Sequence, residues 1–287
     1  MVKQITVKGF LSTTLLLVTI TSVLAQGGKG QTLPRPDHVV IVIEENKSYS
    51  QIVWGSEAPY ILSLAKQGAL FTQSYAIVHS SQPNYLALFS GSTQGITDNS
   101  CPHALSGDNL GAKLFNAGLT FAIYSESMPK AGYEGCVYGT YVRKHNPAVN
   151  WQGVNIPSSA NLPFDDFPKD YTKLPTVSIV VPNQAHDMHD GSIREGDRWL
   201  QNNLASYVEW AKTHNSLLIV TWDEDDGSGN NQIPTIIVGP IVKVGTYSER
   251  INHYNVLRTL EDMFGLPSSG SSTDVSPIKN VWRSKKS

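Results

Sequence analysis

The chain has 287 residues, of which 40% are hydrophobic and 16% are charged. This composition excludes an intrinsically disordered protein and allows one large domain, or two small ones, with a sizeable core. The formal net charge is -2, so the chain lacks the basic excess that a nucleic-acid-binding surface requires.

Residues 1–25 have the pattern of a cleavable secretory signal peptide. Two lysines precede the apolar stretch 10–24, and a small residue, Ala25, ends it. We predict cleavage after Ala25 and a secreted protein. An uncleaved membrane anchor is disfavoured because the stretch is short and carries several Thr and Ser residues. We expect residues 26–37 to be a flexible lead-in, and no later segment is apolar enough to span a bilayer.

Strands and helices are predicted to alternate through the rest of the chain. Runs of Val, Ile and Leu indicate buried strands, and Pro and Gly mark helix limits. Predicted strands cover 38–43, 119–124, 177–181, 217–222 and 235–238, and predicted helices cover 58–67, 83–89, 109–116, 194–213 and 254–264. This alternation predicts an α/β fold: a single-domain sandwich with a mostly parallel central sheet and helices on both faces.

We place this domain at 38–281 and a basic tail at 282–287. Within the domain, residues 126–170 are rich in Gly, Pro, Asn and Asp, and are expected to form a long excursion over the surface.

Three predicted strands run directly into polar residues. These are Glu44-Glu45-Asn46, the cluster 183–190, and Asp223-Glu224-Asp225-Asp226. Because ligands of open α/β sheets bind beyond the carboxyl ends of the strands, we expect the three groups to share one edge. So many carboxylates repel one another unless a cation lies among them. Oxygen ligands suit a hard divalent cation, and histidine widens the choice to manganese, iron or zinc.

Ser81 lies at the start of the helix for which Pro83 is the predicted first residue. Free backbone N–H groups and the helix dipole favour an anion such as phosphate at this position. Ser81 is either a plain N-cap or a nucleophile activated by a base or a metal. The sequence has no G-x-S-x-G, so it lacks the nucleophile elbow of lipase-like serine esterases.

Two cysteines, Cys101 and Cys136, are the only ones in the chain. In an oxidising compartment a disulfide between them is expected in preference to two free thiols or a metal pair. Such a bond would hold an insertion loop in place.

Several motifs occur in the order found in a known family. They are Glu45-Asn46, Ser81-Gln82-Pro83-Asn84-Tyr85, Asp187-x-His189-Asp190, Thr221-x-Asp223-Glu224 and INHYNVLRTLEDMFGLP at 251–267. Over residues 37–281 the chain resembles the phosphoesterase family of secreted acid phosphatases and bacterial phospholipases C, within the alkaline-phosphatase-like superfamily. It is more similar to the acid phosphatase branch, because phospholipases C typically carry Asp-Glu-His-Gly-Gly where this chain has residues 223–227.

The resemblance implies roles for individual residues. Ser81 would be the nucleophile that is phosphorylated and then hydrolysed, His189 would contact phosphate or protonate the leaving group, and Asp187 would orient it. The implied metal ligands are Glu45, Asn46, Ser81, Asp223 and Glu224. The implied contacts with substrate are Asn84, His79 and His253. Gln232 stands where some relatives carry histidine, which favours one divalent metal ion over two.

The predicted function is that of a secreted, metal-dependent acid phosphatase acting on small-molecule or lipid phosphate monoesters. Two alternatives remain open. One is a phospholipase C or other phosphodiesterase with the same site, and the other is a non-catalytic exported metal-binding module. Activity on a monoester and a diester, with and without chelator, separates the three.

Overall fold

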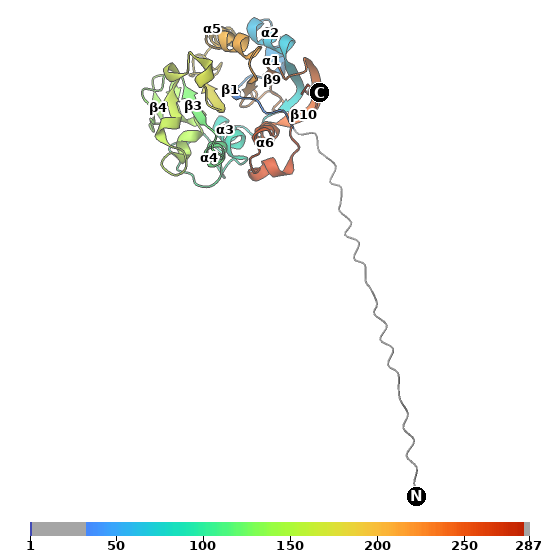
Figure 1. Cartoon of the computed structure of the whole chain (residues 1–287). Coiled ribbons are helices and arrows are strands. Elements are labelled where there is room, and N and C mark those ends of the chain that lie inside the picture. Colours follow the sequence, from blue (N-terminus) through green and yellow to red (C-terminus); the bar gives the residue numbers. More distant parts are fainter. Residues whose placement is uncertain (2–32, 284–287) are drawn as a thin grey trace. The chain divides into compact units, whose positions relative to one another are not determined.

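Eight strands form one sheet with the order β10-β2-β9-β8-β1-β7-β3-β6 (Figure 1). The computed structural model describes residue 1 and residues 33–283. The eight strands of this sheet are β1 (His38–Glu44), β2 (Ala69–Tyr75), β3 (Phe121–Ser125), β6 (Asn161–Pro163), β7 (Val177–Val181), β8 (Ser216–Trp222), β9 (Thr235–Val238) and β10 (Gly245–Asn252). Only β9 runs antiparallel to its neighbours in this sheet. The predicted signal peptide, and most of the predicted lead-in and tail, lie outside the described residues.

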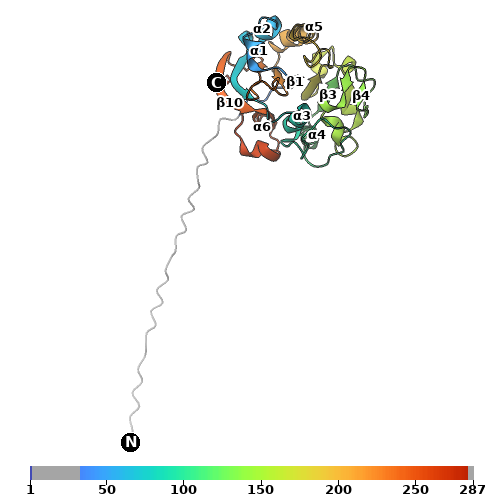
Figure 2. The same cartoon turned by 180° about the vertical axis from the view of Figure 1, so that it is seen from behind.

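Helices cover both faces of the sheet, as Figures 1 and 2 show. The first face carries α1 (Tyr49–Val53), α2 (Pro59–Gln67) and α5 (Ile193–Ala211). The second carries α3 (Ser81–Ser90), α4 (Leu110–Asn116) and α6 (His253–Phe264). The predicted α/β class with a mostly parallel central sheet is therefore confirmed.

Side-chain alternation along β1 determines which carboxylate reaches which face. Val39, Ile41 and Ile43 pack into the core beneath α3, α4 and α6, whereas Val40 and Val42 pack on the side of α1, α2 and α5. Successive side chains of a strand point to opposite faces. Glu44 therefore points to the side of α1, α2 and α5, and Glu45 points to the side of α3, α4 and α6.

A disulfide joins Cys101 to Cys136, with their Cα atoms 5.9 Å apart. Cys136 directly precedes a small hairpin of β4 (Val137–Tyr138) and β5 (Tyr141–Val142). The predicted pairing is confirmed, and it ties this hairpin to the loop that follows α3.

Three expectations from the sequence need correction. The helix predicted from Pro83 begins at Ser81, with Ser80 as its N-cap; Pro83 is tolerated in the first turn because N–H groups there have no helical partner. The segment 126–170 is not wholly superficial, since most of residues 141–151 are buried. Strands β2 and β10 and helix α1 were not predicted at all.

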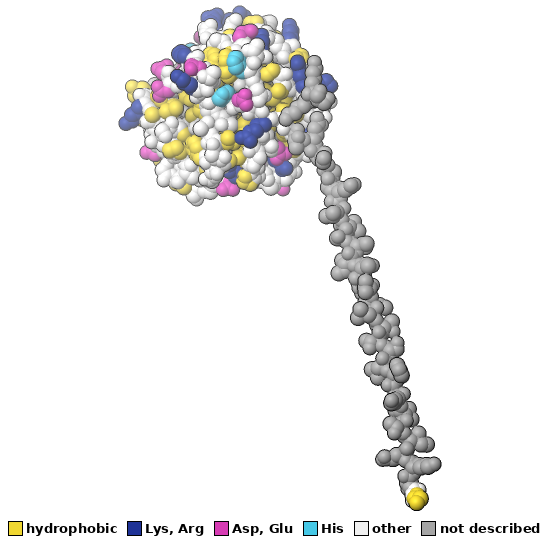
Figure 3. Space-filling view, viewed as in Figure 1, with side chains coloured by type: hydrophobic (Ala, Val, Ile, Leu, Met, Phe, Trp, Pro, Cys, Tyr) yellow, Lys and Arg dark blue, Asp and Glu magenta, His cyan; other side chains and the backbone are white. Residues whose placement is uncertain are grey.

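Two observations bear on surface properties. Figure 3 shows acidic and basic side chains interspersed on the face that it presents. Within residues 33–283, no helix is both long and apolar enough to cross a membrane.

Candidate active site

The predicted site residues meet at the carboxyl edge of the sheet. Strand β1 lies between β7 and β8 and runs parallel to both, so the segments that follow all three strands emerge side by side. Glu45 follows β1, Asp187 lies in the loop after β7, and Asp223 follows β8. The N-terminus of α3, which comes shortly after β2, brings Ser81 to the same edge.

Ser81 is buried between two carboxylates. Its Oγ lies 3.2 Å from Glu45 Oε2 and 3.1 Å from Glu224 Oε1, and it donates to one or the other. Only 1% of Ser81 is exposed. A plain N-cap role is excluded, because the side chain that precedes the helix belongs to Ser80 and Ser81 is already within the first turn.

Glu45 connects Ser81 to the buried residues Tyr85 and His145. Its Oε1 accepts a hydrogen bond from Tyr85 OH and lies 3.2 Å from His145 Nε2. The other ring nitrogen of His145, Nδ1, lies 3.2 Å from Asp187 Oδ2. The His145 ring also stacks on the Tyr85 ring, with centroids 5.2 Å apart. His145 is thus packed against Tyr85 and lies close to Asp187, but neither of its ring nitrogens has a hydrogen-bond partner within the described residues.

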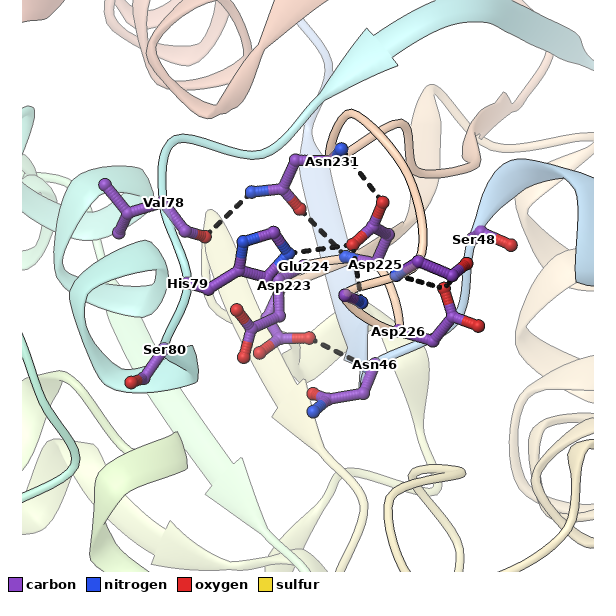
Figure 4. Close-up of polar contacts among 12 residues, drawn as sticks. Asn46, Ser48, Val78, His79, Ser80, Asp223, Glu224, Asp225, Asp226 and Asn231 are labelled. Carbon is purple, nitrogen blue, oxygen red and sulfur yellow. Dashed lines mark hydrogen bonds and ion pairs between the residues drawn. The ribbon is translucent and has the colours of Figure 1, made fainter.

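Asn46 and Asp223 are hydrogen-bonded to each other on another side of the site. The Asn46 backbone N–H donates to Asp223 Oδ1 at 3.0 Å, and the positive φ of Asn46, 46°, is a conformation that asparagine tolerates well. Figure 4 shows Asp223 and Glu224 between Asn46 on one side and His79 and Ser80 on the other.

The carboxylates crowd one another in a buried space. Burial, then repulsion by Asp223 and Asp187, raises the pKa of Glu45 well above its ordinary value. Burial is also the main cause that raises the pKa of Asp187 to about 7, of Asp223 to about 6 and of Glu224 to about 7. Burial lowers the pKa of His145 well below its ordinary value, so its ring is neutral.

The donor atoms at this edge fit a divalent cation. Among the predicted site residues, the buried oxygens Asn46 Oδ1, Asp187 Oδ2, Asp223 Oδ2 and Glu224 Oε2 have no hydrogen-bond partner within the described part of the chain. Glu45, His145 and Asp187 each offer a ligand atom within 4.8 Å of the others. Unpaired buried oxygens of this kind are costly without a cation. Carboxylate and amide oxygens with one imidazole suit ions such as manganese or zinc.

Two of the predicted histidines lie at the more exposed rim. The His189 backbone N–H donates to Asp187 Oδ1 at 2.8 Å, and its ring Nδ1 lies 2.7 Å from Asp190 Oδ1. His79 Nε2 lies 2.7 Å from Oδ1 of the buried Asp225. Both rings are partly accessible, and both stay candidates for contact with substrate.

Asn84 and His253 lie farther from solvent. Asn84 uses its whole amide on the loop before α3: Oδ1 accepts from Ile77 N and Val78 N, and Nδ2 donates to Val78 O and Ser80 O. His253 is buried, and its Nε2 bonds to the Asp223 carbonyl at 2.7 Å. Contact of either side chain with phosphate stays a prediction; the structure places both as supports of the site's loops.

His145 and Tyr85 were not predicted to have a role in the site. His145 belongs to the short 3-10 helix η1 (Arg143–His145), within the segment expected to be superficial. Neither residue follows a predicted strand, so the rule that located the candidate ligands at the carboxyl edge of the sheet did not apply to them. Tyr85 carried a usable signal, because it lies four residues after Ser81 and hence on the same side of the helix.

Comparisons with known proteins identify the family of this chain. The sequence model of the Phosphoesterase family matches residues 54–267. A phosphatidylinositol-3-phosphatase of Mycobacterium tuberculosis is 49% identical over 283 residues, covering 98% of this chain and 94% of that protein. A probable acid phosphatase of Kluyveromyces lactis is 32% identical over 80% of this chain, which spans 58% of that longer protein.

Solved structures show the same fold at low sequence identity. An alkaline phosphatase superfamily protein from Vibrio parahaemolyticus has a TM-score of 0.56 and 14% identity, over 86% of this chain and 72% of that one. A phosphonate monoester hydrolase of Agrobacterium radiobacter also has a TM-score of 0.56 and 14% identity, over 87% and 79%. The relatives named phosphatases identify a phosphoric ester hydrolase, and the family model establishes that this chain belongs to the phosphoesterase family.

Proposed function

We propose that the chain is an exported, metal-dependent phosphatase that hydrolyses phosphate monoesters through a phosphoserine at Ser81. The observation that carries this proposal is the position of Ser81 Oγ, within hydrogen-bond distance of both Glu45 and Glu224 at the N-terminus of α3. A hydroxyl held between two carboxylates has a base at hand to take its proton.

The residues of the chain divide the reaction between them. Ser81 Oγ gives its proton to one of the two carboxylates that it contacts, Glu45 or Glu224. Ser81 Oγ then forms a bond to phosphorus while the bond to the leaving oxygen breaks. His189, at the rim, gives a proton to the leaving alcohol. A water molecule hydrolyses the phosphoserine in the second half of the reaction and frees Ser81.

Glu45, Asn46, Asp223 and Glu224 would hold the metal ion, which when bound supplies positive charge to the phosphoryl oxygens. The unpaired oxygens of Asn46 and Asp223 support this ligand set. Tyr85 and His145 orient Glu45, one by hydrogen bond and the other by close contact.

The substrate is proposed to be a small-molecule or lipid phosphomonoester. The 49% identical relative is named for a phosphoinositide. Residues 223–227, Asp-Glu-Asp-Asp-Gly, differ from the Asp-Glu-His-Gly-Gly that phospholipases C typically carry, which favours a monoester. Export is supported by the signal-like residues 1–25 and by the Cys101–Cys136 disulfide, since such bonds persist mainly in oxidising compartments.

The test compares Ser81→Ala with Ser80→Ala. Ser80 is the adjacent residue and its side chain makes no capping hydrogen bond, so it is a matched control. We expect Ser81→Ala to abolish hydrolysis of an aryl phosphate monoester and Ser80→Ala to retain most of it. Chelation should remove wild-type activity and added divalent metal should restore it. Turnover by Ser81→Ala would refute the nucleophile, and faster turnover of a diester would identify a phosphodiesterase.

A further inference from the structure

Ser81 and His145 reach the same carboxylate from two different segments of the chain. Ser81 is the first residue of α3, and His145 is the last residue of η1. Ser81 Oγ lies 3.2 Å from Glu45 Oε2, and His145 Nε2 lies 3.2 Å from Glu45 Oε1. The separation of α3 and η1 therefore determines whether both side chains can lie against Glu45 at once.

Gln82 fixes the start of α3 to the loop that follows this helix. Its backbone N–H donates to Asn99 Oδ1 at 2.9 Å. Its side-chain Nε2 donates to the carbonyl of Asp98 at 3.2 Å and to the carbonyl of Ser100 at 2.9 Å. Gln82 is 1% exposed, so water does not compete for these hydrogen bonds. The first turn of α3 is therefore held against residues 98–100.

The Cys101–Cys136 disulfide carries this connection to the segment that contains η1. Cys101 directly follows the residues that Gln82 contacts. The carbonyl of Cys136 accepts a hydrogen bond from the Arg143 backbone N–H at 2.9 Å. Arg143 is the first residue of η1, two positions before His145. One covalent bond thus joins the loop beside the nucleophile to the residues that carry His145.

Arg143 reinforces the disulfide from the side of η1. Its guanidinium donates to the carbonyls of Glu134 and His103, both at 2.6 Å. These two residues lie two positions from Cys136 and Cys101, respectively. The planar guanidinium presents its donors in a fixed fork, which suits two carbonyls at once. Arg143 and the disulfide therefore form one cross-link between the two loops.

We propose that this cross-link, made by the Cys101–Cys136 disulfide and Arg143, positions the active site by holding His145 and Ser81 against Glu45. The proposal rests on the proposed function of the site. Glu45 and His145 each offer a ligand atom to a metal ion, so breaking the cross-link should weaken metal binding as well as catalysis. The residues that make the cross-link lie outside the hydrophobic cores on the two faces of the sheet, so the sheet should remain folded without it.

The experiment compares Arg143→Met and the double variant Cys101→Ser/Cys136→Ser with a matched control, Lys113→Gln. Lys113 is also a buried cation, 5% exposed, and donates to Pro267 O at 2.8 Å, but its helix, α4, contributes no residue to the site. Each protein is assayed on an aryl phosphate monoester, its affinity for Mn²⁺ is measured by calorimetry, and its Tm is measured by circular dichroism. Arg143→Lys is added as the conservative variant.

We expect Arg143→Met and the serine variant to weaken Mn²⁺ binding and to lower kcat/KM, each by roughly 10- to 100-fold. At saturating Mn²⁺, kcat should stay below that of wild type, because Ser81 and His145 remain misplaced. Arg143→Lys should recover only part of the loss, since an ammonium keeps the charge but not the fork of donors. Lys113→Gln should lower the Tm and leave Mn²⁺ affinity and kcat/KM unchanged.

Other outcomes overturn the proposal. Wild-type Mn²⁺ affinity and kcat/KM in Arg143→Met would refute it, and so would equal losses in Lys113→Gln, because reduced stability alone would then explain them. A disulfide also constrains the unfolded chain; if the serine variant does not fold, the Arg143 variants, which keep the disulfide, decide. If the wild type hydrolyses no phosphoester, the proposed function fails separately. Mn²⁺ binding then decides: weaker binding by Arg143→Met than by Lys113→Gln supports the cross-link, and equal or absent binding in all proteins refutes it.

Discussion

Replacing Asp223 by Asn should stabilise the metal-free protein at neutral pH while abolishing its activity. Asp223 is 1% exposed, and one of its oxygens has no hydrogen-bond partner in the described chain. An uncharged amide of the same shape can keep the hydrogen bond from Asn46 N at Oδ1. It removes the charge that Glu45 and Glu224 otherwise face.

The magnitude follows from the pKa of this carboxyl. Burial raises the Asp223 pKa to about 6 in the folded protein, from about 4 in the unfolded chain. Between these values the folded state binds the proton more tightly, so the free energy of unfolding falls as pH rises. With 1.4 kcal/mol per unit of pKa difference, the full loss, from pH values well below 4 to values well above 6, is about 3 kcal/mol. Above pH 6 this contribution is constant.

The assay is urea denaturation of chelator-treated protein at pH 4.5 and pH 7.5. We expect the wild-type free energy of unfolding to fall between these values and that of Asp223→Asn to fall by about 2 kcal/mol less, because part of the contribution is already lost at pH 4.5. Asp226→Asn is the control, because Asp226 is the exposed neighbour in the same loop. Divalent metal should restabilise wild type strongly and the variant weakly. Identical pH dependence of wild type and Asp223→Asn would refute the reasoning.

Three further substitutions test the supports of the site. His145→Gln removes the ring between Glu45 and Asp187 and should lower both metal affinity and kcat/KM by roughly 10- to 100-fold; unchanged metal titrations would contradict this. Tyr85→Phe removes the donor to Glu45 and should lower kcat/KM by roughly 10-fold, a result that full activity would rule out. Asn84→Ala breaks four contacts to the loop before Ser81 and should cost about 2–4 kcal/mol of unfolding free energy, whereas a urea midpoint equal to that of wild type would disprove the supporting role.

The central strands were predictable because a strand that is buried on both faces is a continuous run of apolar residues. The strand over Val177–Val181 was predicted with its observed bounds, and the carboxyl-edge rule brought Glu45 and Asp223 together. Strand β10 shows the limit of this approach. In Gly245–Asn252 exposed residues alternate with partly buried ones, as expected at an edge of the sheet, and nothing in the sequence separates this pattern from that of a loop.

The position of His145 could not be predicted from the pattern of buried strands. Its position depends on contacts far along the chain, such as Asn146 Nδ2 with Asn161 Oδ1 at 2.7 Å, and not on the periodicity of its own segment. Gly, Pro and Asn residues in 126–170 correctly indicated an absence of long helices and strands. They did not indicate exposure, because irregular backbone can be buried when its polar groups find partners.

The placement of β1 between β7 and β8 also governs how the molecule is made. The Asn46–Asp223 contact joins residues 177 positions apart, so the nascent N-terminal half contains β1 but neither of its partners. Pairing over such sequence distances is slow, because the chain loses the entropy of closing a large loop before the stabilising contacts form. We therefore expect catalytic activity to appear only once synthesis has passed Glu224. Until then the apolar strand β1 is unpaired and is expected to need a chaperone.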